Sequence, residues 1–344
     1  MNLVELNKVA MSMVAPGRGI LAADESTGTI KKRFDAIGVE CTADSRRDYR
    51  EMLFRSTEAM SKYISGVILY DETIRQSAKD GTPLVTVLER AGSLPGIKVD
   101  KGTKALPFCP GEVVTEGLDG LRERLVEYRG LGAKFAKWRA VIDIGPGIPT
   151  ETCIRANAQA LTRYAALCQE EGLVPIVEPE VLMDGNHDIE RCYQVTEWTL
   201  RELFRELYFG RVMLEGMILK PNMVVSGLKA PKQATISEVA ERTIKCLKVC
   251  VPAAVPGITF LSGGQPGADA SERLNAIAKG STLPWPVTFS FSRALQSEPM
   301  QVWRGDPKNV ARAQAAFLHR AKMNSLAAQG KWNERLEKVK LSTD

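Results

Sequence analysis

The sequence predicts an α/β protein of one domain, a (β/α)8 barrel in which eight parallel strands alternate with helices. Two observations carry this prediction. Eight short β-rich runs alternate with longer helical patterns along the 344 residues. Polar residues near the ends of four runs follow one another at intervals of 41, 42 and 42 residues: Lys137, Glu178, Lys220 and Ser262. One strand, one helix and their loops fill about that length.

Each of the eight runs is short and mainly apolar, as strands covered on both faces are. The runs are Gly19–Ala23, Val67–Tyr70, Ile97–Val99, Lys134–Trp138, Val174–Glu178, Met217–Lys220, Ile258–Ser262 and Val287–Phe291. An open doubly wound sheet is the alternative, but no G-x-G-x-x-G pattern follows the first run. Because no linker interrupts the alternation, we expect one domain over residues 1–344, with a short N-terminal helix and a C-terminal helix and tail.

Four helical segments between the runs begin with residues that commonly cap helices. The stretch after Asp44 is amphipathic as far as Tyr63, and Thr235 has a capping-box partner, Glu238, three residues on. The other two start signals are Thr150 and Asp306-Pro307. Gly330 is expected to close the last helix.

The composition argues against several classes of protein. No apolar run approaches the roughly 18 to 20 residues of a membrane-spanning helix, and the N-terminus has no secretory or organellar targeting pattern, so we expect a cytoplasmic protein. Seven cysteines without C-x-x-C spacing predict reduced thiols. Only two histidines, His187 and His319, are available to a transition metal, and we expect no metal and no cofactor. The net charge of +5 without a long basic block favours a local basic cleft for an anionic small molecule over a nucleic-acid or membrane partner.

Charged residues gather at the ends of the runs. In a parallel barrel the reacting groups come from the carboxyl ends of the strands, so these residues should meet at one mouth. They are Asp24, Lys98, Lys137, Glu178, Lys220 and Arg293. Strand alternation places Arg139 on the side of Lys137, and Glu180 on the side of Glu178. A single charge of this kind commonly faces solvent, whereas the set favours an active site.

Lys220 has the surroundings of a Schiff-base nucleophile. It follows three apolar residues and precedes Pro221. Burial disfavours the ammonium form of a lysine, and a second cation, which Lys137 could supply, disfavours it further. A neutral amine can attack a ketone or aldehyde, and Glu178 and Glu180 could move the protons. The spacing leaves a purely structural ion pair between Lys220 and Glu178 equally open.

Two segments have the composition of phosphate-binding sites. The loop SGGQ at 262–265 follows the seventh run, and Arg293 follows the eighth, which are the usual positions of a phosphate site in such barrels. A second anion site could form from Ser26, Thr29, Lys32, Arg33 and Lys98. Two phosphates would imply a bisphosphorylated substrate. The alternatives are a plain turn for the loop and a solvated helix face for the Lys-Lys-Arg run.

Six motifs occur along nearly the whole chain: LAADEST at 21–27, GIKVDKG at 96–102, FAKWR at 135–139, VPIVEPE at 174–180, LKPNMV at 219–224 and GITFLSGGQ at 257–265. In sequence and in order they resemble those of class I fructose-bisphosphate aldolase. The resemblance implies a (β/α)8 TIM barrel, commonly a homotetramer, that needs no metal.

The resemblance also implies a role for each residue. Lys220 matches the Schiff-base lysine, and Glu178 matches the general acid/base that assists carbinolamine dehydration and takes the C4 hydroxyl proton. The residues implied to support or orient these two are Glu180, Lys137, Arg139 and Asp24, the last beside C3 and C4 of the substrate. The residues implied at the C1 phosphate are Ser262, Gly263 and Arg293, and Gly264 and Ser290 are further substrate-binding residues. Those implied at or near the C6 phosphate are Ser26, Thr29, Lys32, Arg33 and Lys98.

Two departures from the family pattern bear on these roles. The phosphate loop after strand 8, S-Y-G-R in the family, reads S-F-S-R here, so Ser292 replaces a glycine whose N–H meets phosphate. We expect altered affinity rather than lost binding. The sequence reads KLSTD at 340–344, without the tyrosine that many eukaryotic members carry for proton exchange on the enamine. Glu178, a bound phosphate or water are then the candidates for moving the C3 proton.

The resemblance therefore predicts reversible cleavage of fructose 1,6-bisphosphate to dihydroxyacetone phosphate and glyceraldehyde 3-phosphate, in glycolysis and gluconeogenesis. One alternative is another Schiff-base barrel aldolase, or a transaldolase-like enzyme, acting on a monophosphate. Activity with fructose 1-phosphate equal to that with the bisphosphate would favour it. A second alternative is a non-catalytic scaffold that binds anionic surfaces through its basic cleft.

Overall fold

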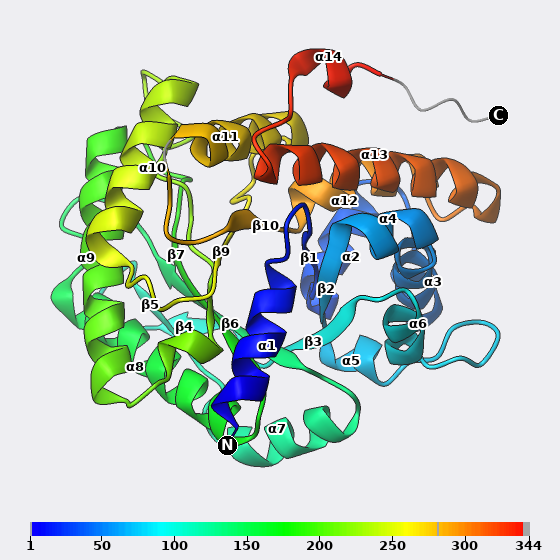
Figure 1. Ribbon diagram of the computed structural model, residues 1–344, viewed down its shortest axis with the longest axis horizontal. Coiled ribbons are helices and arrows are strands. Elements are labelled where there is room, and N and C mark those ends of the chain that lie inside the picture. Colours follow the sequence, from blue (N-terminus) through cyan, green and yellow to red (C-terminus); the bar gives the residue numbers. More distant parts are fainter. Residues whose placement is uncertain (1, 281, 340–344) are drawn as a thin grey trace.

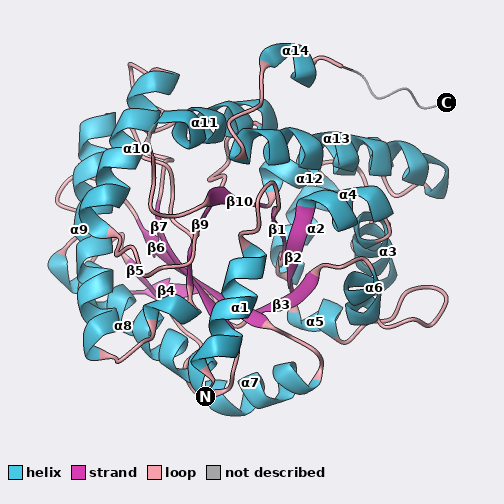
Figure 2. Ribbon diagram, in the orientation of Figure 1, coloured by secondary structure: helices cyan, strands magenta, loops and turns pink. Residues whose placement is uncertain are grey.

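The computed structural model describes residues 2–280 and 282–339, in which eight parallel strands close into a barrel surrounded by helices (Figure 1, Figure 2). The predicted (β/α)8 barrel is confirmed. The strands, in order around the barrel, are β1 (Gly19–Ala23), β2 (Ile64–Leu69), β3 (Leu94–Lys98), β6 (Phe135–Ile142), β7 (Val174–Val181), β8 (Ile218–Leu219), β9 (Ile258–Phe260) and β10 (Val287–Phe291), which pairs with β1.

The helices surround the barrel (Figure 2). They are α1 (Leu3–Met13), α2 (Thr27–Asp35), α3 (Ala43–Phe54), α4 (Thr57–Tyr63), α5 (Asp71–Ile74), α6 (Leu84–Arg90), α7 (Leu121–Gly130), α8 (Glu151–Glu170), α9 (Ile189–Phe209), α10 (Ile236–Cys250), α11 (Gly267–Gly280), α12 (Arg293–Trp303), α13 (Val310–Ala328) and α14 (Glu334–Glu337), with 3-10 turns at Leu214–Gly216 and Pro307–Asn309. None of the helices described is long and apolar enough to cross a membrane.

All eight predicted runs lie on or overlap barrel strands, but two strands begin earlier than expected. β2 and β3 each contain a glycine and a second residue of a type that is uncommon in strands. Strand propensity therefore does not predict the first residues of these two strands. Packing explains the glycine in β3: a Cβ on Gly96 would lie 2.1 Å from the ring of Phe135, which occupies the barrel interior. The large ring and the missing side chain are complementary.

The expected helix from Asp44 to Tyr63 is wrong in two respects. It is two helices, α3 and α4, that separate at Arg55–Ser56. The cap of α3 is Thr42, because its hydroxyl accepts from the backbone N–H of Ser45 at 3.0 Å and the Ser45 hydroxyl accepts from the Thr42 N–H at 2.9 Å. Asp44 lies inside the first turn instead, where its charge still suits the helix dipole.

The other helix signals are confirmed. Thr150 caps α8, and Thr235 forms the expected capping box with Glu238 at the start of α10. Asp306 accepts from the backbone N–H of Lys308 and opens a 3-10 turn that leads into α13. A short antiparallel hairpin, β4 (Thr103–Ala105) and β5 (Val113–Thr115), was not expected between β3 and α7.

Helix α1 packs against the barrel interior and closes one end of it, as its central position in Figure 1 shows. Three buried residues of α1 contact strand residues that include Phe135. The three are Leu6, Ala10 and Met13. Chemistry is thereby left to the opposite, carboxyl end of the strands. The expected domain bounds, 1–344, include residues 1, 281 and 340–344, which lie outside the described part of the chain.

Candidate active site

A cavity of about 430 Å³ lies at the carboxyl ends of the strands. It brings together all of the residues predicted for the site except Gly264. Its predicted lining residues are Asp24, Ser26, Thr29, Lys32, Arg33, Lys98, Lys137, Arg139, Glu178, Glu180, Lys220, Ser262, Gly263, Ser290 and Arg293. A larger groove of about 760 Å³ exists at the end of α9, but none of these residues lines it.

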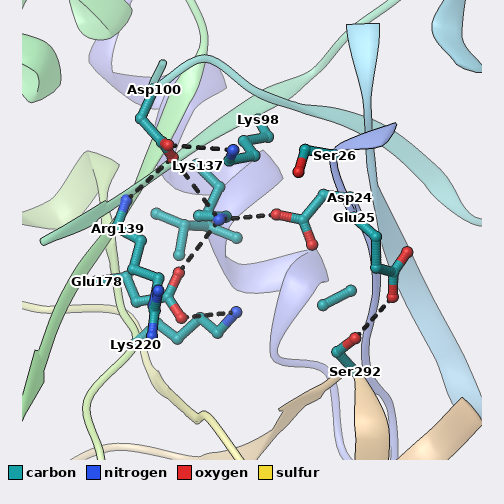
Figure 3. Close-up of polar contacts among 12 residues, drawn as sticks. Asp24, Glu25, Ser26, Lys98, Asp100, Lys137, Arg139, Glu178, Lys220 and Ser292 are labelled. Atoms are coloured by element: carbon teal, nitrogen blue, oxygen red, sulfur yellow. Dashed lines mark hydrogen bonds and ion pairs between the residues drawn. The ribbon is translucent and has the colours of Figure 1, made fainter. Parts of the chain in front are cut away.

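Two buried lysines share one carboxylate at the centre of the cavity (Figure 3). The Nζ atom of Lys220 lies 3.1 Å from Oε1 of Glu178, and the Nζ atom of Lys137 lies 3.5 Å from Oε2 of the same residue. Lys137 also contacts Asp24 at 2.7 Å and Asp100 at 3.8 Å. The structure thus contains the ion pair that the sequence left open, but within a cavity where a substrate can reach it.

Lys137 carries its charge firmly. Burial disfavours the ammonium form, but Asp24, Glu178 and Asp100 outweigh burial and raise the pKa of Lys137 well above its usual value. The converse holds for Asp24, where burial is outweighed by the charges of Lys137, Lys220 and Lys98, and the pKa of the carboxyl is far below its usual value. Lys137 is therefore a fixed positive charge beside Glu178 and a poor proton donor.

Lys220 is held by the backbone that precedes and follows it. Its backbone N–H donates to the backbone oxygen of Val177 at 2.8 Å. This bond places Lys220 beside Glu178, the residue after Val177. Pro221 follows, and Asn222 accepts from the N–H of Val181 at 3.1 Å. These bonds extend the pairing with β7 beyond the two residues of β8 and keep the amine at the cavity.

Arg139 and Glu180 form the second charged pair, one step nearer the mouth. The guanidinium of Arg139 donates to the carboxylate of Glu180, and the backbone N–H of Arg139 donates to the carboxylate of Asp100 at 3.4 Å. Burial opposes the charge of Arg139, but Glu180 outweighs it and raises the pKa of the guanidinium above its usual value. Glu178 and Glu180, which lie two residues apart on one face of β7, thus form ion pairs with different cations.

The loops after β9 and β10 meet at one end of the cavity. Gly263 and Gly264 both have positive φ, 56° and 94°, and a Cβ on Gly264 would lie 3.0 Å from the guanidinium of Arg293. Gly264 therefore lets the loop approach Arg293 without lining the cavity itself. The hydroxyl of Ser290 lines the cavity, is buried, and has no hydrogen-bond partner among the described residues. A bound anion would supply its partner.

The five residues predicted for the second anion site separate. The hydroxyls of Ser26 and Thr29 lie 3.1 Å apart at the start of α2, and Lys98 pairs with Asp100 at 3.2 Å. Arg33 instead contacts Glu25 and Ser292, beside the loop after β10. Lys32 and Arg33 line the cavity, whereas the exposed Lys31 pairs with Asp35, as expected for a solvated helix face.

Sequence reasoning missed three residues that shape the site. Glu25 lines the cavity next to Asp24, and its carboxylate accepts hydrogen bonds from Arg33 and from Ser292. Figure 3 shows the contact with Ser292. Asp100 lies two residues beyond Lys98, a spacing that could have indicated the same side of the strand. Ser292 was noted only as a departure from a family pattern, and its contacts with Glu25 and Arg33 depend on distant segments.

Among the described residues, no group of three or more His, Cys, Asp or Glu side chains is arranged to hold a metal ion.

Comparisons with known proteins agree with this geometry. Residues 5–344 match the family model described as "Glycolytic: Fructose-bisphosphate aldolase class-I". The chain is 58% identical over 333 residues to a probable fructose-bisphosphate aldolase class 1 of Xanthomonas campestris, covering 96% of this chain and 99% of that protein. It is 50% identical over 329 residues to fructose-bisphosphate aldolase C of Carassius auratus, covering 95% and 91%.

A solved structure is similar throughout. Fructose-bisphosphate aldolase of Plasmodium falciparum, in complex with TRAP and a small-molecule inhibitor, superimposes with a TM-score of 0.95 at 47% sequence identity, and the match covers 96% of each chain. With the family model, this extent of similarity shows that the chain belongs to the class I fructose-bisphosphate aldolase family.

Proposed function

We propose that this chain cleaves fructose 1,6-bisphosphate reversibly to dihydroxyacetone phosphate and glyceraldehyde 3-phosphate, with Lys220 as the Schiff-base nucleophile. The observation that carries the assignment is the contact of 3.1 Å between the buried Lys220 amine and Glu178 inside the strand-end cavity. Membership of class I supplies Schiff-base chemistry that needs no metal. The geometry favours Lys220 because Lys137, the other buried lysine, is committed to three carboxylates.

In the first half of the reaction Lys220 transfers a proton to Glu178 and its free amine attacks the C2 ketone. The resulting carbinolamine carries a hydroxyl on C2. Glu178 returns the proton to that hydroxyl, and water leaves as the C2–N iminium forms. Glu178 is suited to both transfers because it contacts the amine nitrogen directly.

In the second half Glu178, now a carboxylate, takes the proton of the C4 hydroxyl. The electrons of the C3–C4 bond move to the iminium nitrogen, which gives an enamine and releases glyceraldehyde 3-phosphate. Protonation at C3 and hydrolysis of the iminium then release dihydroxyacetone phosphate and free Lys220. Lys137 balances the charge of Glu178, and Asp24, 2.7 Å from Lys137, is positioned to hold the substrate hydroxyls.

The test of the nucleophile is borohydride reduction with dihydroxyacetone phosphate in the presence of a metal chelator, followed by peptide mass spectrometry. We expect one stable adduct, on Lys220, in the wild type and none in Lys220→Met. A Lys31→Met variant, which removes an exposed lysine outside the cavity, serves as the matched control and should label fully. An adduct on another lysine, or none with the wild type, would refute the assignment.

The test of the acid/base is Glu178→Gln. We expect turnover to fall by about 100-fold or more, the usual scale for the loss of a general acid/base. Trapping with dihydroxyacetone phosphate should also slow, because dehydration of the carbinolamine needs the same proton. Near-normal turnover of this variant would remove Glu178 from the mechanism.

We propose further that the chain assembles as a homotetramer and acts in the cytoplasm. Exposed apolar side chains at the end of α9 support self-association: Tyr208 and Phe209 are 80% and 67% exposed beside the groove of about 760 Å³. Light scattering should give the mass of a tetramer. We expect Phe209→Glu to lower this mass and Val126→Glu, at an exposed site on α7, to leave it unchanged.

All seven cysteines are free thiols, as a reducing compartment requires. Cell fractionation tests the location of the protein.

A further inference from the structure

We propose that Cys246 and Cys250, on α10, are a site of reversible oxidation. A hydroperoxide oxidises the Cys250 thiol, and the Cys246 thiol then converts the product to a disulfide. Neither residue lines the strand-end cavity, and the reaction described above uses neither of them. Three features of the pair support the proposal: the thiols lie one helical turn apart, they differ in exposure, and the charges near them differ.

The two thiols lie on the same side of α10. Side chains four residues apart in a helix are neighbours, with Cβ atoms about 5–6 Å from each other. Cys246 is 1% exposed, whereas Cys250, the last residue of the helix, is partly exposed. The pair therefore has one thiol that a small oxidant can reach and one that the fold shields.

Helix α9 packs beside α10 and covers the two thiols (Figure 1). The Cys250 thiol donates to the backbone oxygen of Glu197, on α9, at 3.7 Å. A third thiol, that of Cys192, also interacts with Cys246, but it is 1% exposed and its sulfur lies 3.9 Å from the hydroxyl of Thr196. Cys192 is thus the alternative partner for Cys246, and the test below distinguishes the two.

The surroundings of Cys250 favour its thiolate, which is the form that reacts with oxidants. The adjacent Cys246 thiol lowers the pKa of Cys250, and burial opposes this shift. The Arg201 guanidinium lowers the same pKa, against the carboxylate of Glu197. The contact with Cys250 raises the pKa of Cys246, and burial raises it further. Cys250 is therefore the thiol that ionises first, while Cys246 stays protonated.

The oxidation has two steps, and its only co-reactant is the hydroperoxide. The Cys250 thiolate attacks one oxygen of the hydroperoxide, the O–O bond breaks, and a sulfenic acid forms on sulfur while water or an alcohol leaves. The Cys246 sulfur then attacks the Cys250 sulfur and loses its proton to the departing hydroxyl. One water leaves as the S–S bond forms, and a dithiol reductant restores both thiols.

The disulfide requires the last turn of α10 to open, because disulfides hold their Cβ atoms about 3.5–4.5 Å apart, closer than one helical turn does. The turn is closed by a bond from the Val251 N–H to the Leu247 oxygen at 2.8 Å. Pro252 follows and has no N–H with which to continue the helix. A disulfide strained in this way is easily reduced, as reversible oxidation in a reducing compartment requires.

The pair lies at the end of the barrel opposite the cavity. Helix α10 ends where the chain turns back toward β9, at the amino ends of the strands, whereas the cavity is at their carboxyl ends. Oxidation should therefore raise amide hydrogen exchange over 247–251 and leave turnover unchanged. Unchanged exchange in the oxidised protein would show that the helix end does not open and would contradict the proposed disulfide.

The lysines of α10 make the disulfide directly measurable. Trypsin cuts after Lys245 and Lys248, so Cys246 and Cys250 fall on different peptides. The full chain is treated with hydrogen peroxide, its remaining thiols are blocked with N-ethylmaleimide, and it is digested without reduction. We expect the two peptides to be joined, and to separate after dithiothreitol. A link from Cys246 to the Cys192 peptide, or oxidised Cys250 with no link, would overturn the proposal.

Each thiol has its own variant. In Cys246→Ala the sulfenic acid should persist on Cys250 and be trapped by dimedone, and Cys246→Ser serves as a second variant if alanine loosens the packing. Cys250→Ser should show neither the link nor dimedone on Cys246. Cys109→Ser removes a partly exposed thiol of the β4–β5 hairpin and should form the link as the wild type does. Circular dichroism checks that each variant folds. Dimedone on Cys246 in Cys250→Ser would refute the assigned roles.

The part of Arg201 is tested by alkylation of Cys250 with iodoacetamide as a function of pH. We expect Arg201→Gln to move the midpoint of the rate to higher pH and to slow alkylation at pH 7 about two- to fivefold, the scale of an exposed charge. Arg205→Gln, at a similarly exposed position one turn further along α9, should change neither. Glu197 and Tyr193, the other titratable groups of α9 that interact with Cys250, are the same in both variants. Identical profiles for Arg201→Gln and the wild type would remove Arg201 from the site.

Discussion

At the scale of the residue, Lys137 organises the site. Its ammonium group contacts Asp24, Glu178 and Asp100, whose side chains are 12% exposed or less. Electrostatic interactions are strong in such a region because little water screens them. Lys220 is the neighbouring amine, and within the described part of the chain it forms an ion pair with one carboxylate only, that of Glu178. The number of carboxylates around each amine thus distinguishes the fixed charge from the nucleophile.

Removal of the Lys137 charge should change the pH dependence of catalysis. In Lys137→Met, Asp24 loses the cation that contributes most to its low pKa, so this pKa rises. The acidic limb of kcat/KM against pH should then move to higher pH, and turnover should fall. Lys137→Arg keeps the charge and should keep the limb near its wild-type position. An acidic limb that is the same in Lys137→Met and the wild type would show that Lys137 does not set the ionisation of Asp24.

At the scale of the element, the caps decide where the helices next to the site begin. Ser26 accepts from the backbone N–H of Thr29 and so starts α2, the helix that carries Lys32 and Arg33 into the cavity. The chain after β10 enters α12 at Arg293, directly after Ser292. Local backbone signals of this kind act over a few residues, which is why they can be read from the sequence.

The capping box of α10 offers a test that is independent of catalysis. The Glu238 carboxylate accepts from the backbone N–H of Thr235 at 2.7 Å, and the Thr235 hydroxyl accepts from the Glu238 N–H at 3.3 Å. Thr235→Ala should lower the free energy of unfolding by about 1 kcal/mol, measured by urea denaturation, with kcat unchanged. Thr235→Ser keeps the hydroxyl and should keep most of the stability. Equal losses in both variants would mean that the cap hydroxyl is not the cause.

At the scale of the whole molecule, the barrel separates stability from chemistry. Helix α1 and the large ring of Phe135 fill the interior and one end, and the charged groups gather at the other end. The segment that follows β7 carries one more buried ionisable group, His187, which is 8% exposed. Neither of its ring nitrogens has a hydrogen-bond partner among the described residues.

His187 should make the stability of the whole fold depend on pH. Burial lowers its pKa below the usual value, although Asp143 and Asp188 oppose the shift and Arg191 adds to it. The unfolded chain therefore binds a proton near pH 6.5, while the folded chain binds it only at lower pH. The contribution of uncharged His187 to the free energy of unfolding is fully present above about pH 6.5. It is lost as the pH falls from there to the pKa of His187 in the folded chain.

The measurement is the midpoint of urea denaturation as a function of pH for the wild type and for His187→Gln. The wild type should lose stability in this interval, and the variant should lose less. Asp24, whose pKa is also lowered, acts in a separate window, because its contribution is lost only below its ordinary value of about 3.8. Parallel curves for the two proteins as the pH falls below 6.5 would contradict the assignment to His187.

Much of this protein follows from its sequence alone. The spacing of the apolar runs predicts eight strand-helix units, because each unit obeys the same local periodicity and length. The rule that strand ends meet at one mouth then brings Lys137, Glu178 and Lys220 together, and alternation adds Arg139 and Glu180. The motifs that resemble a known family indicate the same chemistry, which the comparisons confirm.

The tertiary structure decided which partner each charged side chain has. Arg33 and Ser292 are 259 residues apart, and no local pattern predicts that they share a hydrogen bond. The position of Asp100 between Lys98 and Lys137 likewise depends on the registration of β3 against β6. Periodicity and capping are properties of neighbouring residues, whereas ion pairs and close packing depend on which segments the fold brings together. The sequence therefore determined the barrel and its chemistry, and the tertiary structure determined which side chains pair with one another within the site.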